Sequence, residues 1–391
     1  MPTPLAVMFA DAHVDSHTWA AIPTLCGDSA FSLRQIFDFA IKNNVPYIIS
    51  AGDQFDSQKC KSYPYAIWNE QLDRLRKTNS KFLFIDGNHD WDNPPKLAFH
   101  DRAIYIDSKI FQLGPFTAYG LSYKSSAELA EALASMPSAD WLICHQGWKE
   151  IQRFGATQGS ITQIQKAKKV LTGDYHKNFT KIIDNGSYPL EIFSPGSIAL
   201  QDISEPADKY FFVLYDDGTV QRVPLRTRIV IDVSNLQETK DVINFVNSLG
   251  EKLTQAINTA KALGYPQTVI APIVRGYYDR SLSETIRVIY DKFSEITKEK
   301  GILCYLFLRE YNSSPKACPH GVFELNTAID GSIVLATEEF LLQRLEKSEA
   351  DKDTISLAET LLHSEEPREA FKLWRKNFLK KTCGISSEEI F

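Results

Sequence analysis

The feature that most constrains the fold is an alternation of apolar, strand-like runs with amphipathic helical segments. The strand-like runs lie at residues 5–10, 45–51, 81–86, 141–145, 169–173 and 190–194. Between them, residues 31–43 and 63–77 place apolar side chains at helical spacing. Strands that alternate with helices predict an α/β layered fold.

Five of the six strand-like runs end in side chains of types that can bind metals. In chain order these are Asp11 and His13, Asp53 and Asp56, Asn88 and His89, His145, and finally Asp174 and His176. Each motif alone is explained as well by a turn or cap, and a single histidine by ordinary burial. Ligands gather at the carboxyl ends of strands in α/β sheets. Five such ends together therefore indicate a metal centre.

Taken in order, these motifs resemble those of the calcineurin-like metallophosphoesterase superfamily. They read D-A-H at 11–13, G-D-Q-F-D at 52–56, G-N-H-D at 87–90, a single His145, and G-D-Y-H at 173–176. The resemblance implies a sandwich of mixed β-sheets flanked by helices, with a dinuclear centre of Mn²⁺, Fe or Zn. Because the ligand set mixes nitrogen and oxygen, Mn²⁺ is the expected ion and Mg²⁺ the alternative.

The resemblance also assigns roles to these residues. Asp53 would bridge two ions. Asp11, His13 and His176 would complete the ligands of the first ion, and Asn88, His145 and Asp174 would complete those of the second ion. The ion pair would lower the pKa of a bridging water for attack on phosphate. His89 would remain free of metal and assist the leaving oxygen, while Asp56 would orient His13 or His89.

Asp174 departs from the superfamily pattern, which has histidine at that position. A carboxylate there keeps an acceptor atom and adds a negative charge, which favours hard ions such as Mn²⁺ or Mg²⁺. The alternative is that Asp174 marks a decayed second site in a non-catalytic assembly subunit.

The segment after G-D-Y-H resembles the SbcD family of double-strand-break nuclease subunits, with bacterial, archaeal, eukaryotic and bacteriophage counterparts. It contains Ser194-Pro195-Gly196-Ser197, a hairpin over 209–225, and a basic run, Pro224–Arg228. The resemblance implies DNA phosphodiester cleavage, as 3′→5′ exonuclease and single-strand endonuclease. It also implies an SMC-like ATPase partner of SbcC type and a homodimer formed through the nuclease domain. Arg226 and Arg228 are candidate DNA contacts, with a structural role left open.

Three regions are expected. Residues 1–228 form the metallophosphoesterase (nuclease) domain, and 229–335 form a small α/β capping domain with strands near 228–233, 268–276 and 302–310. The capping domain also has expected helices over 237–263 and 281–300. Residues 336–391 form a helical, charged C-terminal segment, the candidate docking region for the ATPase.

Composition limits the remaining choices. A net charge of −6 does not indicate a nucleic-acid binder, although clustered metal-binding carboxylates lower this average without describing the substrate face. Six scattered cysteines, and no apolar run of membrane-spanning length, predict a cytoplasmic protein with no membrane association. The competing function is a stand-alone phosphomonoesterase or cyclic-nucleotide phosphodiesterase of the same superfamily.

Overall fold

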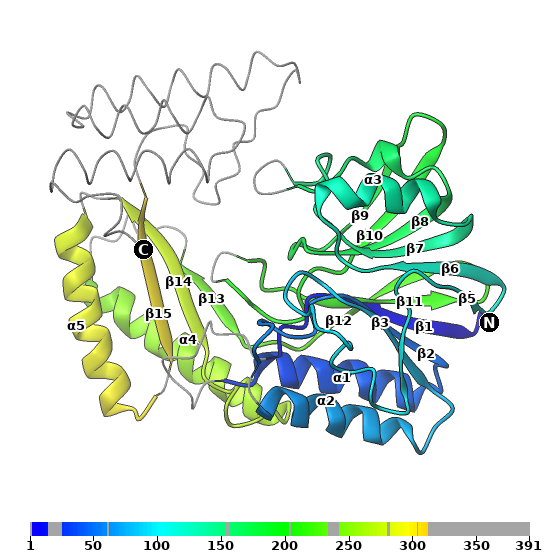
Figure 1. The fold of residues 1–391 in the computed structure, drawn as a ribbon. Helices are drawn as coiled ribbons and strands as arrows, with labels where there is room; N and C mark the ends of the chain where they lie inside the picture. The colour runs from blue at the N-terminus through cyan, green and yellow to red at the C-terminus, as the bar shows by residue number, and fades with distance from the viewer. Residues whose placement is uncertain are drawn as a thin grey trace, which may run out of the picture. The chain divides into compact units, whose positions relative to one another are not determined.

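The computed structural model describes residues 2–14, 26–60, 62–152, 157–202, 205–233, 242–279, 282–302 and 304–311. Two six-stranded sheets form the centre of the N-terminal part (Figure 1). The first has the strand order β12-β11-β1-β2-β3-β4. Its strands are β1 (Pro4–Phe9), β2 (Tyr47–Ala51), β3 (Lys81–Ile85), β4 (Ala103–Tyr105), β11 (Tyr210–Tyr215) and β12 (Val220–Pro224).

The second sheet has the strand order β5-β6-β7-β8-β10-β9. Its strands are β5 (Ile110–Leu113), β6 (Phe116–Leu121), β7 (Ala139–His145), β8 (Ala167–Gly173), β9 (Phe179–Asp184) and β10 (Pro189–Ser194). Both sheets are mixed, but β1, β2 and β3 are parallel neighbours, as are β7 and β8. Parallel neighbours end at the same edge, so the residues that follow these strands are brought together.

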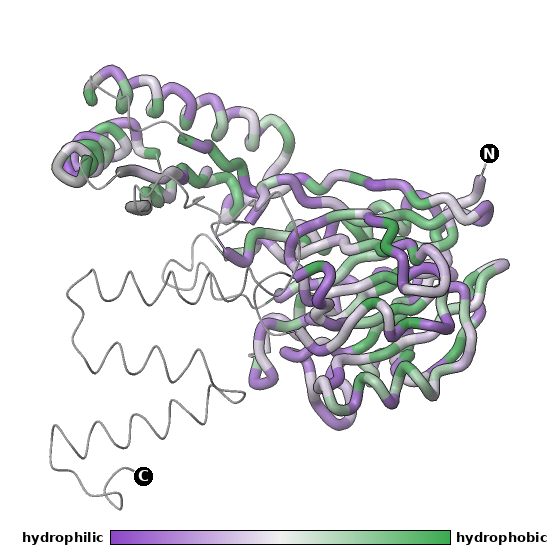
Figure 2. The backbone as a smooth tube through the Cα atoms, turned by 90° about the horizontal axis from the view of Figure 1, so that it is seen from above, coloured by the Kyte–Doolittle hydropathy of each residue, from purple (hydrophilic) through white to green (hydrophobic). Residues whose placement is uncertain are grey.

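The two sheets pack face to face, and helices cover their outer faces. Along β1, Ala6 and Met8 enter the core between the sheets, whereas Val7 and Phe9 enter the core beneath the helices. This alternation is the period of two expected of a strand buried on both faces. Figure 2 shows hydrophobic segments recurring through the interior of the N-terminal part of the chain.

Helices α1 (Asp28–Lys42) and α2 (Ser62–Leu75) cover the first sheet, and α3 (Ser126–Ser135) with the 3₁₀ helix η2 (Ile161–Gln163) covers the second. The resulting order of layers is helix, sheet, sheet, helix (Figure 1). This arrangement confirms the predicted fold class, a β-sandwich flanked by helices.

A third sheet follows in the chain. It contains three parallel strands, β13 (Val230–Val233), β14 (Ile273–Asp279) and β15 (Tyr305–Tyr311), with β14 in the middle. Helices α4 (Val242–Ala262) and α5 (Ser283–Glu299) share its apolar core. The strands and helices expected between 229 and 311 are present, but the capping-domain boundary at 335 stays a prediction. It lies outside the described residues, as does the expected helical segment 336–391.

Several elements were not predicted, namely β4, β5, β6, β9 and α3. Strands β4, β5 and β9 are short or partly exposed, so their apolar pattern is weak. Helix α3 does carry a signal, since Ser125 and Glu128 have the spacing of a capping box. The backbone N–H and hydroxyl of Ser125 donate to Glu128 Oε2 at 3.1 and 2.7 Å. Within the described part of the chain, no helix is long and apolar enough to cross a membrane.

Candidate metal centre

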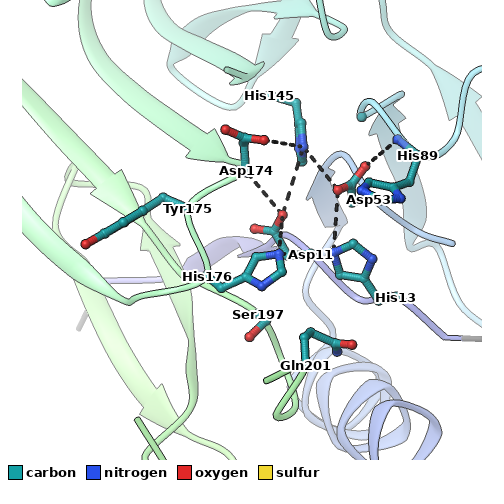
Figure 3. A network of polar contacts seen from close by, with 12 residues as sticks. Asp11, His13, Asp53, His89, His145, Asp174, Tyr175, His176, Ser197 and Gln201 are labelled. Atoms are coloured by element: carbon teal, nitrogen blue, oxygen red, sulfur yellow. Dashed lines mark hydrogen bonds and ion pairs between the residues drawn. The ribbon is translucent and has the colours of Figure 1, made fainter. Parts of the chain in front are cut away.

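The polar side chains predicted at the strand ends meet at one place in the structure (Figure 3). They follow β1, β2, β3 and β8, and one of them, His145, is the last residue of β7. Their ligand atoms form two groups in which all atoms lie within 4.8 Å of one another. The first group is Asp11, His13 and His176; the second is Asp11, Asp53 and His145.

In the first group, the two imidazoles turn their Nε2 atoms toward each other. The distance from His13 Nε2 to His176 Nε2 is 3.2 Å, and His176 Nε2 lies 3.9 Å from Asp11 Oδ1. Figure 3 shows the two rings beside the Asp11 carboxylate. Two imidazole nitrogens and a carboxylate that face one point are a donor set suited to a divalent ion.

In the second group, His145 is held by the backbone. Its Nδ1 donates to the carbonyl oxygen of Ala51 at 2.8 Å, which leaves the Nε2 lone pair directed into the site. That Nε2 lies 3.1 Å from Asn88 Oδ1 and 3.3 Å from Asp53 Oδ2. Three acceptors at these distances need a proton or a cation among them.

Asp53 lies between the two groups. Its Oδ2 is 3.5 Å from His13 Nε2 and 3.3 Å from His145 Nε2, while its Oδ1 accepts the backbone N–H of His89 at 3.1 Å. The carboxylate is therefore placed where a ligand shared by two ions would be needed.

Asp174 lies on the side of the second group. Its Oδ1 is 3.9 Å from His145 Nε2, and its backbone N–H donates to Asp11 Oδ1 at 3.0 Å. Its other oxygen, Oδ2, accepts from Gln152 Nε2 at 3.1 Å. One carboxylate oxygen thus faces the candidate metal centre, and the other is held by the protein.

The residues present fit a pair of divalent cations. Among the described residues, the buried Asp11 Oδ2 has no hydrogen-bond partner. Burial lowers the pKa of His145, but the negative charges of Asp53 and Asp11 outweigh it and hold that pKa well above its usual value. Burial also lowers the pKa of His13, but the hydrogen bond to Asp56 and the charges of Asp53, Asp11 and Asp56 outweigh it and raise that pKa to about 9. The same negative charge attracts a divalent ion, which would displace these protons on binding.

The glycines of the motifs allow the ligands to approach one another. A Cβ on Gly52, which has φ +92°, would lie 2.4 Å from His145 Nδ1. A Cβ on Gly87 would lie 2.0 Å from Asp53 Oδ1. Only glycine fits at either position, which explains why glycine precedes the ligand residue in these motifs.

The ligand residues also adopt backbone conformations that are rare for residues with side chains. Asp11, His13, Asp53 and Asp174 have φ values of +51°, +40°, +53° and +77°. Each such residue costs on the order of 1–3 kcal/mol, and such strain clusters at functional sites.

His89 and Asp56 lie next to the first group. His89 Nδ1 donates to the backbone oxygen of Asp56 at 2.8 Å, and the His89 ring packs edge-on against His13. The Asp56 carboxylate lies 3.2 Å from His13 Nδ1. Asp56 is thus placed to orient His13 through its carboxylate and His89 through its backbone oxygen.

Sequence reasoning missed the role of Asp90. This buried carboxylate accepts the backbone N–H groups of Gln54, Phe55 and Gly87 at 3.1, 2.9 and 2.9 Å. Burial, together with the charge of Asp53, raises the pKa of Asp90 to about 6. Asp90 ties the loop after β2 to the loop after β3, and its signal was the final letter of G-N-H-D.

Two further residues near the site, Glu205 and Lys209, were also missed. Glu205 Oε1 accepts from His176 Nδ1 at 2.8 Å, and Lys209 Nζ donates to Glu205 Oε2 at 2.7 Å. Glu205 lies far from the histidine motif in the sequence, so spacing alone gave no signal for this contact.

The candidate DNA contacts are placed differently from each other. Arg228 is 1% exposed and forms two hydrogen bonds to Asp28, at 2.9 and 2.7 Å, so its guanidinium is not presented to a ligand. These contacts give Arg228 the structural role that the sequence left open, and a DNA contact by Arg228 stays an untested prediction. Arg226 is exposed, but its guanidinium donates to the backbone oxygen of Leu263 at 2.8 Å and lies over Phe31. A DNA contact by Arg226 stays a prediction.

A two-sheet sandwich with acidic and imidazole ligands gathered at its strand ends defines a metal-dependent phosphoesterase. The comparisons with known proteins agree: the family described as "Calcineurin-like phosphoesterase" matches residues 6–214. The chain belongs to this family, whose members use divalent metals to hydrolyse phosphoesters.

Similar proteins carry more specific names. The chain is 27% identical over 235 residues to the DNA double-strand break repair protein Mre11 of Sulfurisphaera tokodaii. The aligned region covers 53% of this chain and 60% of that protein. The chain is 23% identical to the Mre11 protein of Saccharolobus solfataricus, over 68% of this chain and 80% of that protein. It is also 23% identical to the uncharacterized metallophosphoesterase YhaO of Bacillus subtilis, over 74% and 76% of the two chains.

Among solved structures, a Zn²⁺ complex of Vps29 from Entamoeba histolytica aligns with 56% of this chain and 98% of that one. Its TM-score is 0.26 and its sequence identity is 17%.

Proposed function

We propose that the chain is a metal-dependent nuclease that hydrolyses DNA phosphodiesters. The observation that carries the proposal is the meeting of two ligand groups around Asp11 and Asp53. Support for DNA as the substrate comes from the two Mre11 proteins, which are named for double-strand break repair. In this proposal, Mn²⁺ or Mg²⁺ occupies both groups. Asn88 and Asp174 belong to the second group, His89 is the catalytic histidine, and Asp56 orients it.

The roles of the protein groups follow from their placement. Bound ions would supply Lewis-acid activation of water and neutralise the charge on the phosphate. The His89 Nδ1–H group donates a hydrogen bond to the Asp56 carbonyl, which fixes the ring. As an imidazolium, His89 would give its Nε2 proton to the leaving oxygen and become a neutral imidazole that keeps its Nδ1 proton. The hydrogen bond from the His89 backbone to Asp53 keeps this imidazole beside the metal ligands.

A cavity beside Asn88 supports a nucleic-acid substrate. It has a volume of about 380 Å³, and its lining includes Trp91, Tyr123 and Lys124. Trp91 is 69% exposed, which is unusual for a large aromatic side chain. An exposed indole next to a phosphate-cleaving centre is suited to stacking on a nucleobase.

We expect Mn²⁺-dependent degradation of end-labelled single- and double-stranded DNA, measured on denaturing gels. The variant His89→Ser should lose most of this activity, because proton transfer by a positioned side chain contributes about 10²- to 10⁴-fold. Hydrolysis of nitrophenyl phosphate without any cleavage of DNA would contradict the nuclease proposal. That result would favour the phosphomonoesterase alternative, and cleavage of cyclic nucleotides alone would favour the phosphodiesterase.

The variant Trp91→Ala separates DNA recognition from phosphate chemistry. It should lower kcat/KM on DNA about 10-fold, since stacking of one base contributes about 1–3 kcal/mol. Hydrolysis of bis-nitrophenyl phosphate should be unchanged. Phe99→Ala is the matched control, because Phe99 is 80% exposed and does not line the cavity. Equal losses on both substrates would show that Trp91 supports the metal centre and does not bind a base.

The assembly is part of the same proposal and rests on the resemblance to the SbcD family. We expect a homodimer through the nuclease domain and an SMC-like ATPase partner of SbcC type, docked on residues 336–391. Light scattering of the chain with and without these residues, in the presence of the ATPase, tests both interactions.

A further inference from the structure

A buried polar cluster lies directly behind the metal ligand His176. It consists of Ser197, Glu205 and Lys209, from the segment that joins β10 to β11. All three side chains are buried. Figure 3 shows Ser197 beneath the His176 ring.

Glu205 determines which nitrogen of His176 carries the proton. A carboxylate only accepts hydrogen bonds when ionised, so the 2.8 Å contact with Glu205 Oε1 places the proton on His176 Nδ1. His176 Nε2 then keeps its lone pair on the side that faces Asp11 and His13. Burial raises the pKa of Glu205, but the hydrogen bond from His176 and the charge of Lys209 outweigh it and bring that pKa to about 2.

The second oxygen of Glu205 is held just as firmly. Glu205 Oε2 accepts from Lys209 Nζ and from Ser197 Oγ, both at 2.7 Å, and from the backbone N–H of Gln201 at 3.2 Å. Lys209 Nζ also donates to Ser197 Oγ at 2.7 Å. The carboxylate therefore has one orientation, and the His176 ring is oriented with it.

The backbone of Glu205 is held from the three-stranded sheet. Arg275 of β14 donates from Nη1 to the carbonyl oxygen of Glu205 at 2.6 Å. Arg275 is in turn fixed by Asp232 of β13, whose carboxylate accepts from Nε at 2.6 Å and from Nη2 at 3.3 Å. Asp232 and Arg275 are register partners in the sheet, which places their side chains together.

We propose that Glu205 is a positioning residue for His176 and that Arg275 holds Glu205 in place, so that the three-stranded sheet tunes metal binding. The proposal rests on the proposed metal centre, but it does not depend on DNA being the substrate. Its alternative is that the cluster only stabilises the fold.

Metal binding distinguishes the two roles, and it is measured without substrate. Mn²⁺ is titrated into chelator-treated protein, and the free ion is followed by electron paramagnetic resonance. Glu205→Ala should weaken one of the two Mn²⁺ sites about 10- to 100-fold, which is the usual cost of removing the partner of a ligating histidine. Glu205→Gln should weaken it less, because the amide oxygen can still accept from His176 Nδ1.

Arg275→Met should weaken the same site, and Arg275→Lys should recover part of the affinity because lysine can also donate to the Glu205 carbonyl. Arg226→Met is the matched control. Arg226 likewise donates from its guanidinium to a backbone carbonyl, but its acceptor is Leu263 and not Glu205. We expect Mn²⁺ affinity in Arg226→Met to stay within about twofold of wild type.

Three results would overturn the proposal. If Arg275→Met and Arg275→Lys lower thermal stability but bind Mn²⁺ as wild type does, the cluster is only structural. If wild type itself binds no Mn²⁺, the metal centre fails and this proposal fails with it. Weakening of both sites to the same extent in Glu205→Ala would also contradict a role specific to His176.

Discussion

At the scale of single residues, Asp174 is the position at which the candidate second metal group differs from the histidine of the superfamily pattern. Its left-handed backbone is one that aspartate tolerates better than most residues. Its Oδ1 faces His145, while Gln152 holds Oδ2. A carboxylate in this position can ligate a hard ion, so the departure from histidine is compatible with an intact site.

We therefore expect Asp174→His to change metal preference more than stability. The ratio of Zn²⁺ to Mn²⁺ affinity should rise about 10-fold, since imidazole suits softer ions than carboxylate does. The free energy of unfolding of metal-free protein should change by less than about 1 kcal/mol, since Asp174 is partly exposed. Competitive metal titration and urea unfolding measure the two effects. Asp184→His, at an exposed position on β9, is the control.

A large loss of stability at unchanged metal preference would show that Asp174 is a structural residue. In that case the hydrogen bond that the Asp174 carboxylate accepts from Gln152 would be the main contribution of its side chain.

The sequence allowed the ligand types to be predicted because they stand directly after apolar strands. The end of a strand fixes the position of the residues that follow it, so short motifs such as D-A-H and G-N-H-D are enough to place their side chains at the edge of the sheet. Glu205 and Arg275 have no such signal. Their contacts depend on how loops and sheets from distant parts of the chain pack, which local pattern does not encode.

At the scale of elements, the helical spacing of apolar residues predicted α1 and α2 well, because each helix buries one apolar face on the first sheet. The unpredicted strands β4 and β9 bury little, and their positions depend on pairing with β3 and β10. A helix that buries one face against a sheet has apolar residues at regular spacing in its sequence. An edge strand held mainly by backbone pairing has almost no such pattern.

The contact between α1 and the segment after β12 yields a prediction about stability. Asp28 and Arg228 form a buried, bidentate ion pair. Arg228 also donates to the backbone oxygens of Ala271 and Thr268 at 2.7 and 2.9 Å. Asp28→Asn should lower the free energy of unfolding by about 3–5 kcal/mol, because it leaves a buried guanidinium without its counter-charge. Urea unfolding followed by circular dichroism measures the loss.

The exposed pair of Asp38 and Arg74 is the matched control. Asp38→Asn should cost less than about 1 kcal/mol, as expected for an ion pair in water. Equal losses at Asp28 and Asp38 would contradict the view that Arg228 anchors this contact. Arg228→Met combined with Asp28→Asn should recover part of the loss, because the uncompensated charge is then gone.

At the scale of the whole molecule, metal binding, protonation and stability are linked. Several of the gathered groups, namely Asp11, His13, Asp90 and His145, bind protons more tightly in the folded than in the unfolded protein. Asp53 does the opposite: burial raises its pKa, but the charges of His145 and His13 outweigh burial and lower that pKa. Burial and the charge of Asp90 raise the pKa of Asp86 to about 7, the pKa of Asp90 is about 6, and that of His13 is about 9. Glu205 is opposite in sign: its pKa of about 2 gives stability that is fully present above about pH 4.5 and is lost as the pH falls toward 2.

A raised folded-state pKa gives stability that is present at low pH and lost as the pH rises through that value. Chelator-treated protein should therefore lose stability steadily from about pH 4 to pH 9, first through Asp86 and Asp90 and then through His13. If Mn²⁺ binds as proposed, it would take the place of these protons, and it should add about 2.7 kcal/mol to the free energy of unfolding at a free concentration 100 times its Kd. The difference in Tm between Mn²⁺-loaded and chelated protein should consequently widen from pH 5 to pH 8.

The variant Asp86→Asn tests the proton part of this linkage separately. In chelated protein it should match wild type near pH 4 and be more stable near pH 8, by up to about 4 kcal/mol, because each pKa unit corresponds to about 1.4 kcal/mol. Asp53→Asn, which removes the carboxylate between the two ligand groups, should abolish most of the stabilisation by Mn²⁺. A Tm difference that stays constant or narrows as the pH rises would mean that cations do not bind where these charges gather.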